Sequence, residues 1–561
     1  MSGNTTKKIT KKQKCDSLDQ KSRVQLETAI NRSLSQKELD TACLLIDRYL
    51  KKYEHDLSYE QLCVIANTLC INDRLEEAFH VCMRAIRMDA NESTAPEVLF
   101  WIYQNRGDKQ ALTVIDRLIE SGPVDRRSTY LYWKAVYANN HSLPELVLDC
   151  VEKAGGPPDS SFEKYQEVTY SVIMALCMLG RVNEAEKISA QVPDEFMFKT
   201  KYLPMAFAQI SQAKGDIENS VKIYDEFLDK NPDTVEARWN RALANLAAGN
   251  LEQGWTDFEC RWTWKGYPST EKKLAIPKWN GESLNGKSIL FWAEQGLGDQ
   301  IMFLTLALPI IQNPQTKVSI EVDQKLIPIV SAWYPEATVS GLNLFHCEDV
   351  VEYQSFDYHL PIGSLPKHYL ANIASLHNRP VRYLRGDSAF KQSVTQSNQF
   401  EDPTLPLVGV CWRSSFLSAQ RSQAYLNVEA VAKITTELKG LCNFVTLQYA
   451  LQDSELSVLA DCPNVLVPEE DFFTDVTAHA KYIGICDIVL TAGTLTSQLA
   501  GIFDRDTLVW GVGGWTFLGQ RQFPWYRNHA SLATEINYDK VALVNKLIKW
   551  LRISLEHKTY R

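Results

Sequence analysis

The sequence lacks the signatures of several protein classes. None of its 13 cysteines forms a Cys-x-x-Cys pair, and Cys63, Cys177 and Cys411 each stand alone in an apolar stretch. Isolated thiols of this kind are typical of reduced core cysteines and argue against a disulfide framework or a zinc site. We therefore expect no bound metal, and no motif indicates another cofactor.

Long hydrophobic segments are also missing. A membrane-spanning helix needs about 18 apolar residues or more, and the longest candidate, residues 301–311, is too short. The first residues contain no apolar segment of the kind found in secretory signals. These absences predict a cytoplasmic location and no membrane span.

A positive net charge is absent as well. The formal net charge is −9, which argues against non-specific nucleic-acid binding, because that relies on clustered Lys and Arg. The one basic run lies at residues 7–14 in a Ser- and Thr-rich start, and we interpret residues 1–22 as a disordered tail. The rest is ordinary globular composition, and 561 residues are enough for several domains.

Between residues 23 and 265 the sequence contains a helical repeat. Turn signals recur at positions 73, 107, 180, 215 and 249, so the steps are 34, 73, 35 and 34 residues. The step of 73 corresponds to two periods, with the missing turn expected near His141. A small residue follows each turn about five positions on, where it lets the second helix of a pair pack closely on the first. Within one unit, Trp239, Ala242, Leu243 and Leu246 fall on one face of a helix.

This pattern resembles the tetratricopeptide repeat, most strongly over residues 165–262. The resemblance implies an array that stacks helix pairs and presents a concave surface to a protein or peptide partner. The alternative is a solenoid that only orients the domain after it. The oligomeric state is not predicted.

After a linker at residues 266–285 the pattern changes to alternating strands and helices. We expect a first lobe at residues 286–395 and a second at 405–535, each a parallel sheet flanked by helices. The expected strands are 288–292 and 318–322 in the first lobe, and 407–412, 443–448, 487–491 and 507–512 in the second. Two such lobes place a ligand cleft at the carboxyl ends of their strands. Residues 536–561 are expected to form a helix that crosses back to the first lobe.

The first candidate site follows the first strand. That strand ends in Glu294-Gln295-Gly296-Leu297-Gly298-Asp299, with a helix expected over 299–311. Gly296 and Gly298 allow a ligand to approach the amides of the helix N-terminus. Asp299 has two interpretations: a general base for a hydroxyl group, or a cap for its own helix. Glu294 is the next candidate base. A dinucleotide fingerprint is weak, because Ile301 takes the place of its third glycine.

The second candidate site lies in the second lobe. Strand 407–412 runs into Arg413, and Arg421 follows in a polar loop, so that two guanidinium groups can clamp a phosphate. The alternative is a pair of surface arginines. The turn Gly493-Thr494-Leu495-Thr496-Ser497 precedes a helix expected over 497–503. Its hydroxyls and amides suit the phosphates of a nucleotide-sugar, although Thr496 or Ser497 can equally serve as a helix cap.

A run of motifs makes the resemblance of this region specific. They are WNGESLNGKSILFWAEQGLGDQIMF at 279–303, FDYHLPIGSLP at 356–366, VGVCWRSS at 408–415, VTLQY at 445–449, DIVLTAGTLTSQLAG at 487–501 and PWY at 524–526. In this order they resemble the transferase domain of repeat-linked bacterial proteins related to the heptosyltransferases. The resemblance implies a two-lobed glycosyltransferase of the GT-B type. It assigns proton removal from the acceptor hydroxyl to Asp299, and contact with the donor phosphate to a basic residue near Arg421.

The chain departs from that family at two positions. The related enzymes have Asp where this chain has Gly493, and His where it has Gln498, whereas Thr494 and Gly501 are kept. Loss of the Asp, which is expected to hold donor sugar hydroxyls, implies a different donor sugar or an inactive domain. Nearby aromatic residues have two interpretations, stacking on a nucleobase or sugar, or packing in the core. They are Trp510, Trp515, Phe517, Phe523, Trp525 and Tyr526.

The combined prediction is an α plus α/β chain. Tetratricopeptide-like repeats precede a two-lobed, Rossmann-like GT-B domain that moves a sugar from a nucleotide-sugar to a hydroxyl of a protein or glycan, without a metal. The layout resembles that of O-GlcNAc transferases and of flagellin-modifying transferases, which makes a flagellin-like protein one candidate acceptor by analogy of architecture. The alternative is a protein-interaction scaffold with a degenerate transferase domain.

Overall fold

The computed structural model describes residues 23–36, 38–53, 57–343, 353–396, 400–415, 425–511, 514–533 and 539–559. The predicted disordered tail, residues 1–22, lies outside these ranges. The chain divides into two units, residues 1–175 and 176–561. Among the described residues, no helix combines the length and the apolar character that crossing a membrane requires.

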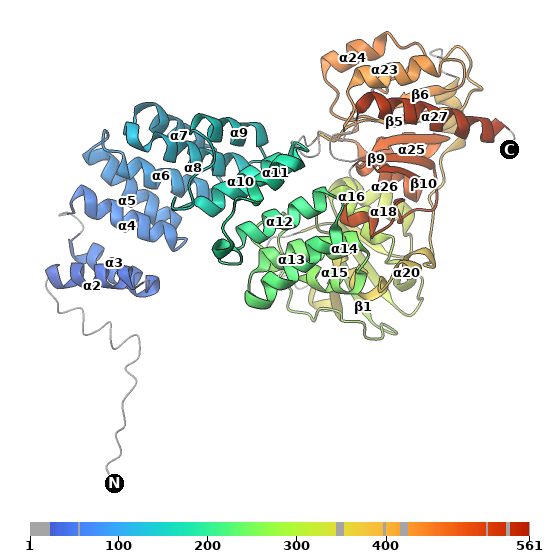
Figure 1. The fold of residues 1–561 in the computed structure, drawn as a ribbon. Coiled ribbons are helices and arrows are strands. Elements are labelled where there is room, and N and C mark those ends of the chain that lie inside the picture. Colours follow the sequence, from blue (N-terminus) through green and yellow to red (C-terminus); the bar gives the residue numbers. More distant parts are fainter. Residues whose placement is uncertain are drawn as a thin grey trace. The chain divides into compact units, whose positions relative to one another are not determined.

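The first unit consists of antiparallel helix pairs (Figure 1). The pairs are α2 (Arg23–Ser35) with α3 (Leu39–Tyr53), α4 (Tyr59–Ile71) with α5 (Leu75–Met88), α6 (Thr94–Arg106) with α7 (Gln110–Ser121), and α8 (Arg127–Asn140) with α9 (Pro144–Lys153). α6 ends at Gly107, whose φ of 69° allows the left-handed turn that stops a helix. The turn predicted near His141 lies between α8 and α9, where Ser142 has a φ of 55°.

Small residues allow the helices of a pair to approach one another. Ala78 is fully buried after the turn at Asp73, and Ala185 and Ser220 are fully buried after the turns at Gly180 and Gly215. This confirms the spacing predicted from the repeat. α10 (Tyr165–Met178) runs across the division between the two units.

The second unit begins with further helix pairs and continues into the α/β region without a break in its core. Its helices are α11 (Val182–Ser189), α12 (Tyr202–Ala213), α13 (Ile217–Lys230), α14 (Val235–Ala248) and α15 (Leu251–Phe258), followed by the short η4 (Glu259–Thr263). Trp239, Leu246 and Trp255 of α14 and α15 belong to the same hydrophobic cluster as the first sheet. The hydrophobic core therefore continues across the predicted domain boundary near residue 265.

The first α/β lobe contains a four-stranded parallel sheet in the order β3-β2-β1-β4. Its strands are β1 (Ser288–Trp292), β2 (Lys317–Val322), β3 (Thr338–Gly341) and β4 (Tyr358–Pro361). Its helices are α16 (Leu297–Leu304), α17 (Leu308–Ile311), α18 (Ile327–Trp333), α19 (Leu365–Tyr369) and α20 (Ile373–His377). The central strand, β1, pairs Ile289 with Val318 on one side and with Tyr358 on the other.

The second lobe contains a six-stranded parallel sheet in the order β10-β9-β8-β5-β6-β7. Its strands are β5 (Leu407–Cys411), β6 (Asn443–Thr446), β7 (Val465–Leu466), β8 (Ile488–Ala492), β9 (Asp506–Gly511) and β10 (His529–Ala533). Its helices are α21 (Ser388–Thr395), α23 (Val428–Glu437), α24 (Asp453–Ala460), α25 (Val476–Ile485), α26 (Leu495–Ile502) and α27 (Lys540–Thr559). Two separate parallel sheets confirm the predicted two-lobed architecture.

Three details correct the prediction. The helix expected over 299–311 is divided into α16 and α17, because Pro309 lacks an N–H and its ring would clash with the carbonyl of Thr305. α21, placed in the first lobe, packs on the second, where Lys391 forms an ion pair with Asp487 at 2.6 Å. α27 does not cross to the first lobe; Leu547 and Leu551 pack in the cluster under the second sheet.

The segment after β9 packs on both α15 and the first lobe. Trp515 packs on Trp255, Phe258 and Phe303, with ring centroids 6.1, 5.9 and 6.3 Å apart. Gly519 lies so close to Gly249 that a Cβ on Gly519 would be 2.8 Å from the Gly249 Cα.

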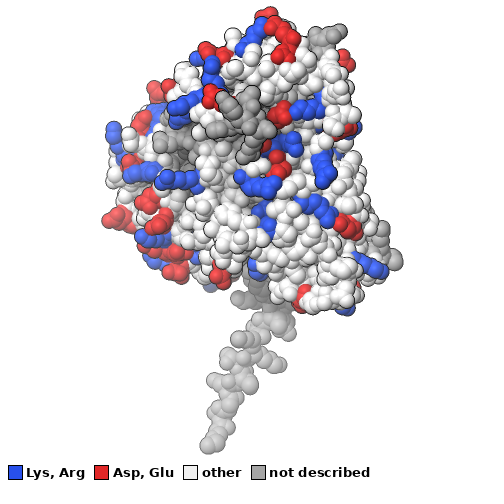
Figure 2. Space-filling view, turned by 90° about the vertical axis from the view of Figure 1, so that its right-hand side faces the viewer, with Lys and Arg blue, Asp and Glu red and all other residues white. Residues whose placement is uncertain are grey.

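On the face drawn in Figure 2, Lys and Arg side chains gather across the middle.

Candidate active site

The turn after β1 places a carboxylate at the start of α16. Gln295 adopts a φ of 64°, which redirects the chain, and Gly296 is the N-cap of α16. The backbone N–H of Gly296 donates to Oδ2 of Asp299 at 3.3 Å. Asp299 thus caps its own helix, as one interpretation of the sequence proposed, and it also lines a cavity.

The turn after β8 is built by side-chain hydroxyls. Thr494 caps α26 by accepting a hydrogen bond from the Thr496 N–H at 3.3 Å. Ser497 donates its hydroxyl hydrogen bond to the Thr494 carbonyl at 2.8 Å. Gly493 is exposed, and a Cβ built on it would meet no atom within 4 Å. The turn therefore does not need glycine for steric reasons.

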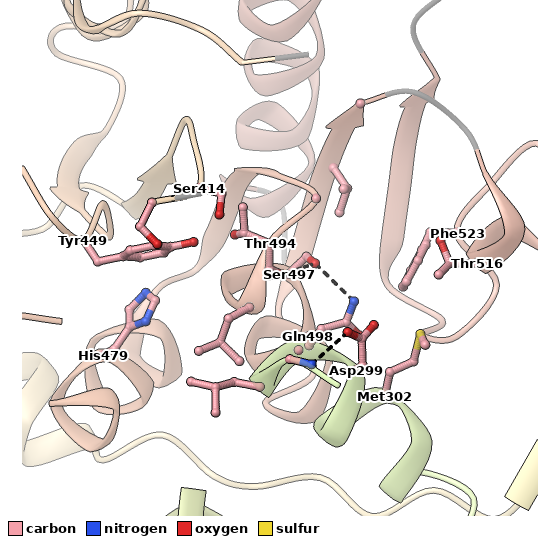
Figure 3. A pocket seen from close by; sticks show the side chains of 18 of the residues that line it. Asp299, Met302, Ser414, Tyr449, His479, Thr494, Ser497, Gln498, Thr516 and Phe523 are labelled. Carbon is pink, nitrogen blue, oxygen red and sulfur yellow. Dashed lines mark hydrogen bonds between the residues drawn. The ribbon is translucent and has the colours of Figure 1, made fainter. Parts of the chain in front are cut away.

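The two turns face one another across the lobes. A Cβ on Gly298 would lie 3.5 Å from Cγ of Gln498 and 3.6 Å from Cα of Leu495. Beside this contact is a cavity of about 690 Å³ that Asp299, Thr494 and Ser497 all line. Figure 3 shows the Asp299 carboxylate beside Gln498, with Ser497 and Thr494 beyond it on α26 and its cap. The structure thus brings the two predicted turns into one site, to which Gly296, Gly298, Gly493 and Gln498 also contribute.

Sequence reasoning missed several lining residues that come from the ends of other strands. Lys325 follows β2, Ser414 follows β5, and Tyr449 follows β6. The available signal was topological, since the carboxyl ends of parallel strands converge on one edge of a sheet. Lys325 donates to the Phe473 carbonyl at 2.8 Å. It is the only Lys or Arg among the described residues that line this cavity.

His479 of α25 is a buried neutral group in the cavity wall. Its ring stacks on Phe472 with centroids 4.9 Å apart, and burial lowers the pKa of His479 to about 3. The Thr496 hydroxyl lies 3.4 Å from Nε2 of His479 and is fully buried. Thr496, predicted as a donor ligand, does not line the cavity, because its hydroxyl is buried against His479.

Glu294 does not line the cavity, which corrects its prediction as a candidate base. Its carboxylate accepts two hydrogen bonds from Arg261, at 2.7 and 2.8 Å, and one from the Gly363 N–H at 2.8 Å. Tyr267 donates a further hydrogen bond to it. With its oxygens already held by these donors, Glu294 anchors η4 to the end of β1. Gln295 is likewise directed to Tyr267, to whose hydroxyl Nε2 donates at 2.9 Å.

Arg413 is also a structural residue rather than a phosphate ligand. Its Nε donates to Oε1 of Glu455 at 2.9 Å, and its Nη2 donates to the other oxygen of the same carboxylate. Nη2 also donates to the Ala450 carbonyl at 2.8 Å. The buried pair fastens α24 to the end of β5. Arg421 lies outside the described residues.

The aromatic residues after β9 divide between the two interpretations. Trp510, Trp515, Phe517 and Phe523 line the cavity, whereas Trp525 and Tyr526 do not. Trp525 is fully buried and donates to the Thr516 carbonyl at 2.9 Å. Part of this segment therefore packs in the hydrophobic core, and the rest lines the cavity.

No family model matches the chain. A curated relative, Protein FlbA of Caulobacter vibrioides, is 26% identical over 373 residues, an alignment that covers 57% of this chain and 62% of the relative. The match thus spans less than two thirds of the relative's length.

The chain is also similar to several solved structures. The ADP-heptose heptosyltransferase II of E. coli is 13% identical and covers 48% of this chain and 99% of its own, with a TM-score of 0.37. A tetratricopeptide repeat protein of Parabacteroides merdae is 18% identical and covers 42% and 91%, with a TM-score of 0.35. The Thermobaculum terrenum O-GlcNAc transferase is 14% identical and covers 78% and 94%, with a TM-score of 0.25.

Proposed function

We propose that the second unit is a glycosyltransferase that moves a sugar from a nucleotide-sugar to a hydroxyl group. The observation that carries the proposal is the shared cavity, where the Asp299 carboxylate of one lobe meets the Thr494 and Ser497 turn of the other. A volume of about 690 Å³ falls in the range of sites that enclose a small molecule.

The residues can divide the reaction between them. Asp299 takes the proton from the acceptor hydroxyl as its oxygen bonds to the anomeric carbon. The bond from that carbon to the donor phosphate breaks, and the nucleotide leaves with the bonding electrons. The N-terminus of α26 and the Thr494 hydroxyl then face the negative charge that develops on the phosphate. Lys325, which lines the same cavity, adds a positive charge.

The helix pairs of the first unit supply the acceptor in this proposal. Stacked repeats of this type present an extended surface to a polypeptide, and a protein or glycan acceptor is recruited there. A flagellin-like protein remains a candidate acceptor. Independence from a metal and a cytoplasmic location remain predictions.

Gly493 and Gln498 support a second candidate, a non-catalytic interaction scaffold. The cavity leaves room for a side chain at Gly493, so the Asp of the related enzymes would fit and its absence is not imposed by packing. The buried Oε1 of Gln498 has no hydrogen-bond partner among the described residues. A site that holds a different sugar and a site that has lost its chemistry share these features.

A thermal-shift screen separates the two candidates. UDP-, GDP-, ADP- and CMP-linked sugars are added to the full chain, because a ligand that binds the native state raises its stability by mass action. We expect one donor to raise the melting temperature, and Thr494→Val to reduce that shift. Thr256→Val, an exposed threonine on α15, serves as the matched control. If no donor raises the melting temperature of the wild type while the repeats still bind a partner, the scaffold hypothesis is correct.

A further inference from the structure

A second cavity lies behind the aromatic segment of the second lobe. It has a volume of about 910 Å³ and is lined by residues between His377 and Tyr383 and by residues 519–527 with His529. Arg379, Arg521 and Arg527 line it, and no Asp or Glu is among the described residues that do so. Its wall therefore favours a negatively charged occupant, in a chain whose net charge is −9.

Arg379 has no carboxylate partner among the described residues. Its Nη1 donates to the Leu376 carbonyl at 2.7 Å and its Nη2 donates to the Trp525 carbonyl, while the buried Nε has no partner among the described residues. Both partners are neutral backbone groups. Burial accordingly lowers the pKa of Arg379 below its usual value, because the charged form loses hydration.

Two neighbouring arginines have the carboxylate partner that Arg379 lacks. Arg382 donates to both oxygens of Glu336, at 2.6 and 2.7 Å. Arg527 likewise donates to both oxygens of Asp504, at 3.1 and 2.5 Å. The chain therefore provides carboxylates for the arginines on either side, but none for Arg379 among the described residues. A partly buried cation without a counter-charge is unfavourable, because no ion pair replaces the hydration that it loses.

Two further polar atoms below the cavity have no partner among the described residues. They are the hydroxyl of Tyr526 and Nδ1 of His529, both on side chains that are buried. The two rings lie 4.9 Å apart. Unpaired polar atoms are rare in folded interiors, and a cluster of them often marks a place that water or a ligand completes.

We propose that this cavity is a binding site for a phosphate group, with Arg379 and Arg521 as its ligands. A guanidinium group matches the oxygens of a phosphate with two parallel hydrogen bonds. Arg521 is exposed at the rim, and the described residues supply it with no carboxylate. The phosphate is either free or carried by a larger molecule such as a sugar phosphate.

The site is connected to the candidate active site through two residues. Nε2 of His529 donates to the Ser497 carbonyl at 2.9 Å, and Ser497 lines the first cavity. Phe523 lines both cavities. The proposal does not depend on the glycosyltransferase activity, because phosphate binding is measured without turnover.

Calorimetric titration of the full chain with inorganic phosphate, in a constant chloride background, tests the proposal. We expect Arg379→Gln to weaken binding about tenfold or more, the scale of a lost charged hydrogen bond, and Arg521→Gln to weaken it less. The matched control is Arg382→Gln, which removes a neighbouring arginine that already has a carboxylate and should leave phosphate affinity unchanged. A parallel titration with glucose 1-phosphate distinguishes the sources: tighter binding than phosphate indicates a sugar-linked group, and equal binding indicates the free ion.

Two variants distinguish phosphate binding in this cavity from a folding defect and from phosphate binding in the first cavity. Arg521 is exposed, so Arg521→Gln tests the site even where Arg379→Gln does not fold. A loss of phosphate binding in Thr494→Val would reveal phosphate that binds in the first cavity. The proposal is overturned if the wild type binds no phosphate beyond the chloride background. It is equally overturned if both arginine variants bind phosphate as tightly as Arg382→Gln.

Discussion

Arg261, at the end of the last helix pair, and Glu294, at the end of β1, form a two-point ion pair in which both side chains are completely shielded from solvent. Ser364 and Tyr267 hydrogen-bond to the same pair. The repeat region is thus fastened to the strand that carries the Asp299 turn. The relationship predicts that these two residues are a stability determinant of the second unit.

Arg261→Ala should destabilise the second unit by about 3–5 kcal/mol, because the Glu294 charge is left buried and unpaired. Urea unfolding followed by tryptophan fluorescence measures the change. The matched control is Arg382→Ala, which breaks the more exposed pair with Glu336 and should cost no more than about 1 kcal/mol. Equal effects of the two substitutions would show that the buried pair is not a stability determinant.

A second prediction concerns the glycine beside this pair. A Cβ on Gly363 would lie 2.4 Å from Oε1 of Glu294, so Gly363→Ala must displace a carboxylate that its own backbone N–H binds. We expect a loss of about 1–3 kcal/mol, as for overpacked interiors. Gly493→Ala is the control, because its new Cβ meets open space. The melting temperatures of both variants measure the difference. A Gly363→Ala variant as stable as the wild type would contradict the close contact between Gly363 and Glu294.

These contacts show why the sequence predicted the lobes better than the site. The strand at 288–292 was predicted with its observed bounds, because an apolar run of that length between polar turns has few alternatives. β3 was missed, since its four residues are half-exposed and carry no apolar pattern. Glu294 and Arg413 were placed in the site because each follows a strand, but their partners lie 33 and 42 residues away along the chain. Sequence position alone does not reveal such pairing.

The site's geometry was predictable where the backbone determines it and unpredictable where side chains compete. Asp299, Thr494 and Ser497 reach the cavity because parallel strands deliver their turns to one edge of each sheet. Thr496 differs from its neighbours by facing α25, where His479 lies. No pattern in the sequence distinguishes one hydroxyl of that turn from the next.

Acid should weaken the second unit through its buried histidines. Burial lowers the pKa of His479 to about 3 and that of His529 to about 4, while in the unfolded chain a histidine titrates near 6.5. Between these values the unfolded state binds more protons, so stability is complete above about pH 6.5 and falls as pH decreases toward the folded pKa. The slope approaches about 1.4 kcal/mol per pH unit for each histidine.

His479→Phe should flatten this dependence, because the variant has no proton to bind at that position and keeps a ring beside Phe472. Urea unfolding at a series of pH values between 7 and 4.5 measures the slope. His377→Gln, an exposed histidine at the end of α20, is the control and should retain the slope of the wild type. An unchanged slope in His479→Phe would remove His479 from the acid response.

The last prediction concerns Asp299 and decides between enzyme and scaffold. Asp299→Asn keeps the shape of the side chain and an oxygen that can accept the Gly296 N–H, so the fold and donor binding should remain. Turnover should fall by about a hundredfold or more, because an amide cannot take the proton of the acceptor hydroxyl. Sugar incorporation into candidate acceptors, followed by intact-protein mass, measures turnover.

Asp387→Asn is the matched control for this substitution. Asp387 caps α21 by accepting from the Ala389 and Phe390 N–H groups at 2.9 and 3.1 Å, and it does not line the cavity. If Asp299 acted only as a cap, the two variants would show the same small change in stability and the same activity as the wild type. Full transfer by Asp299→Asn would exclude it as the base. No transfer by the wild type with any donor would leave the scaffold as the explanation. A selective loss in Asp299→Asn, with donor affinity retained, would place the proton transfer on this carboxylate.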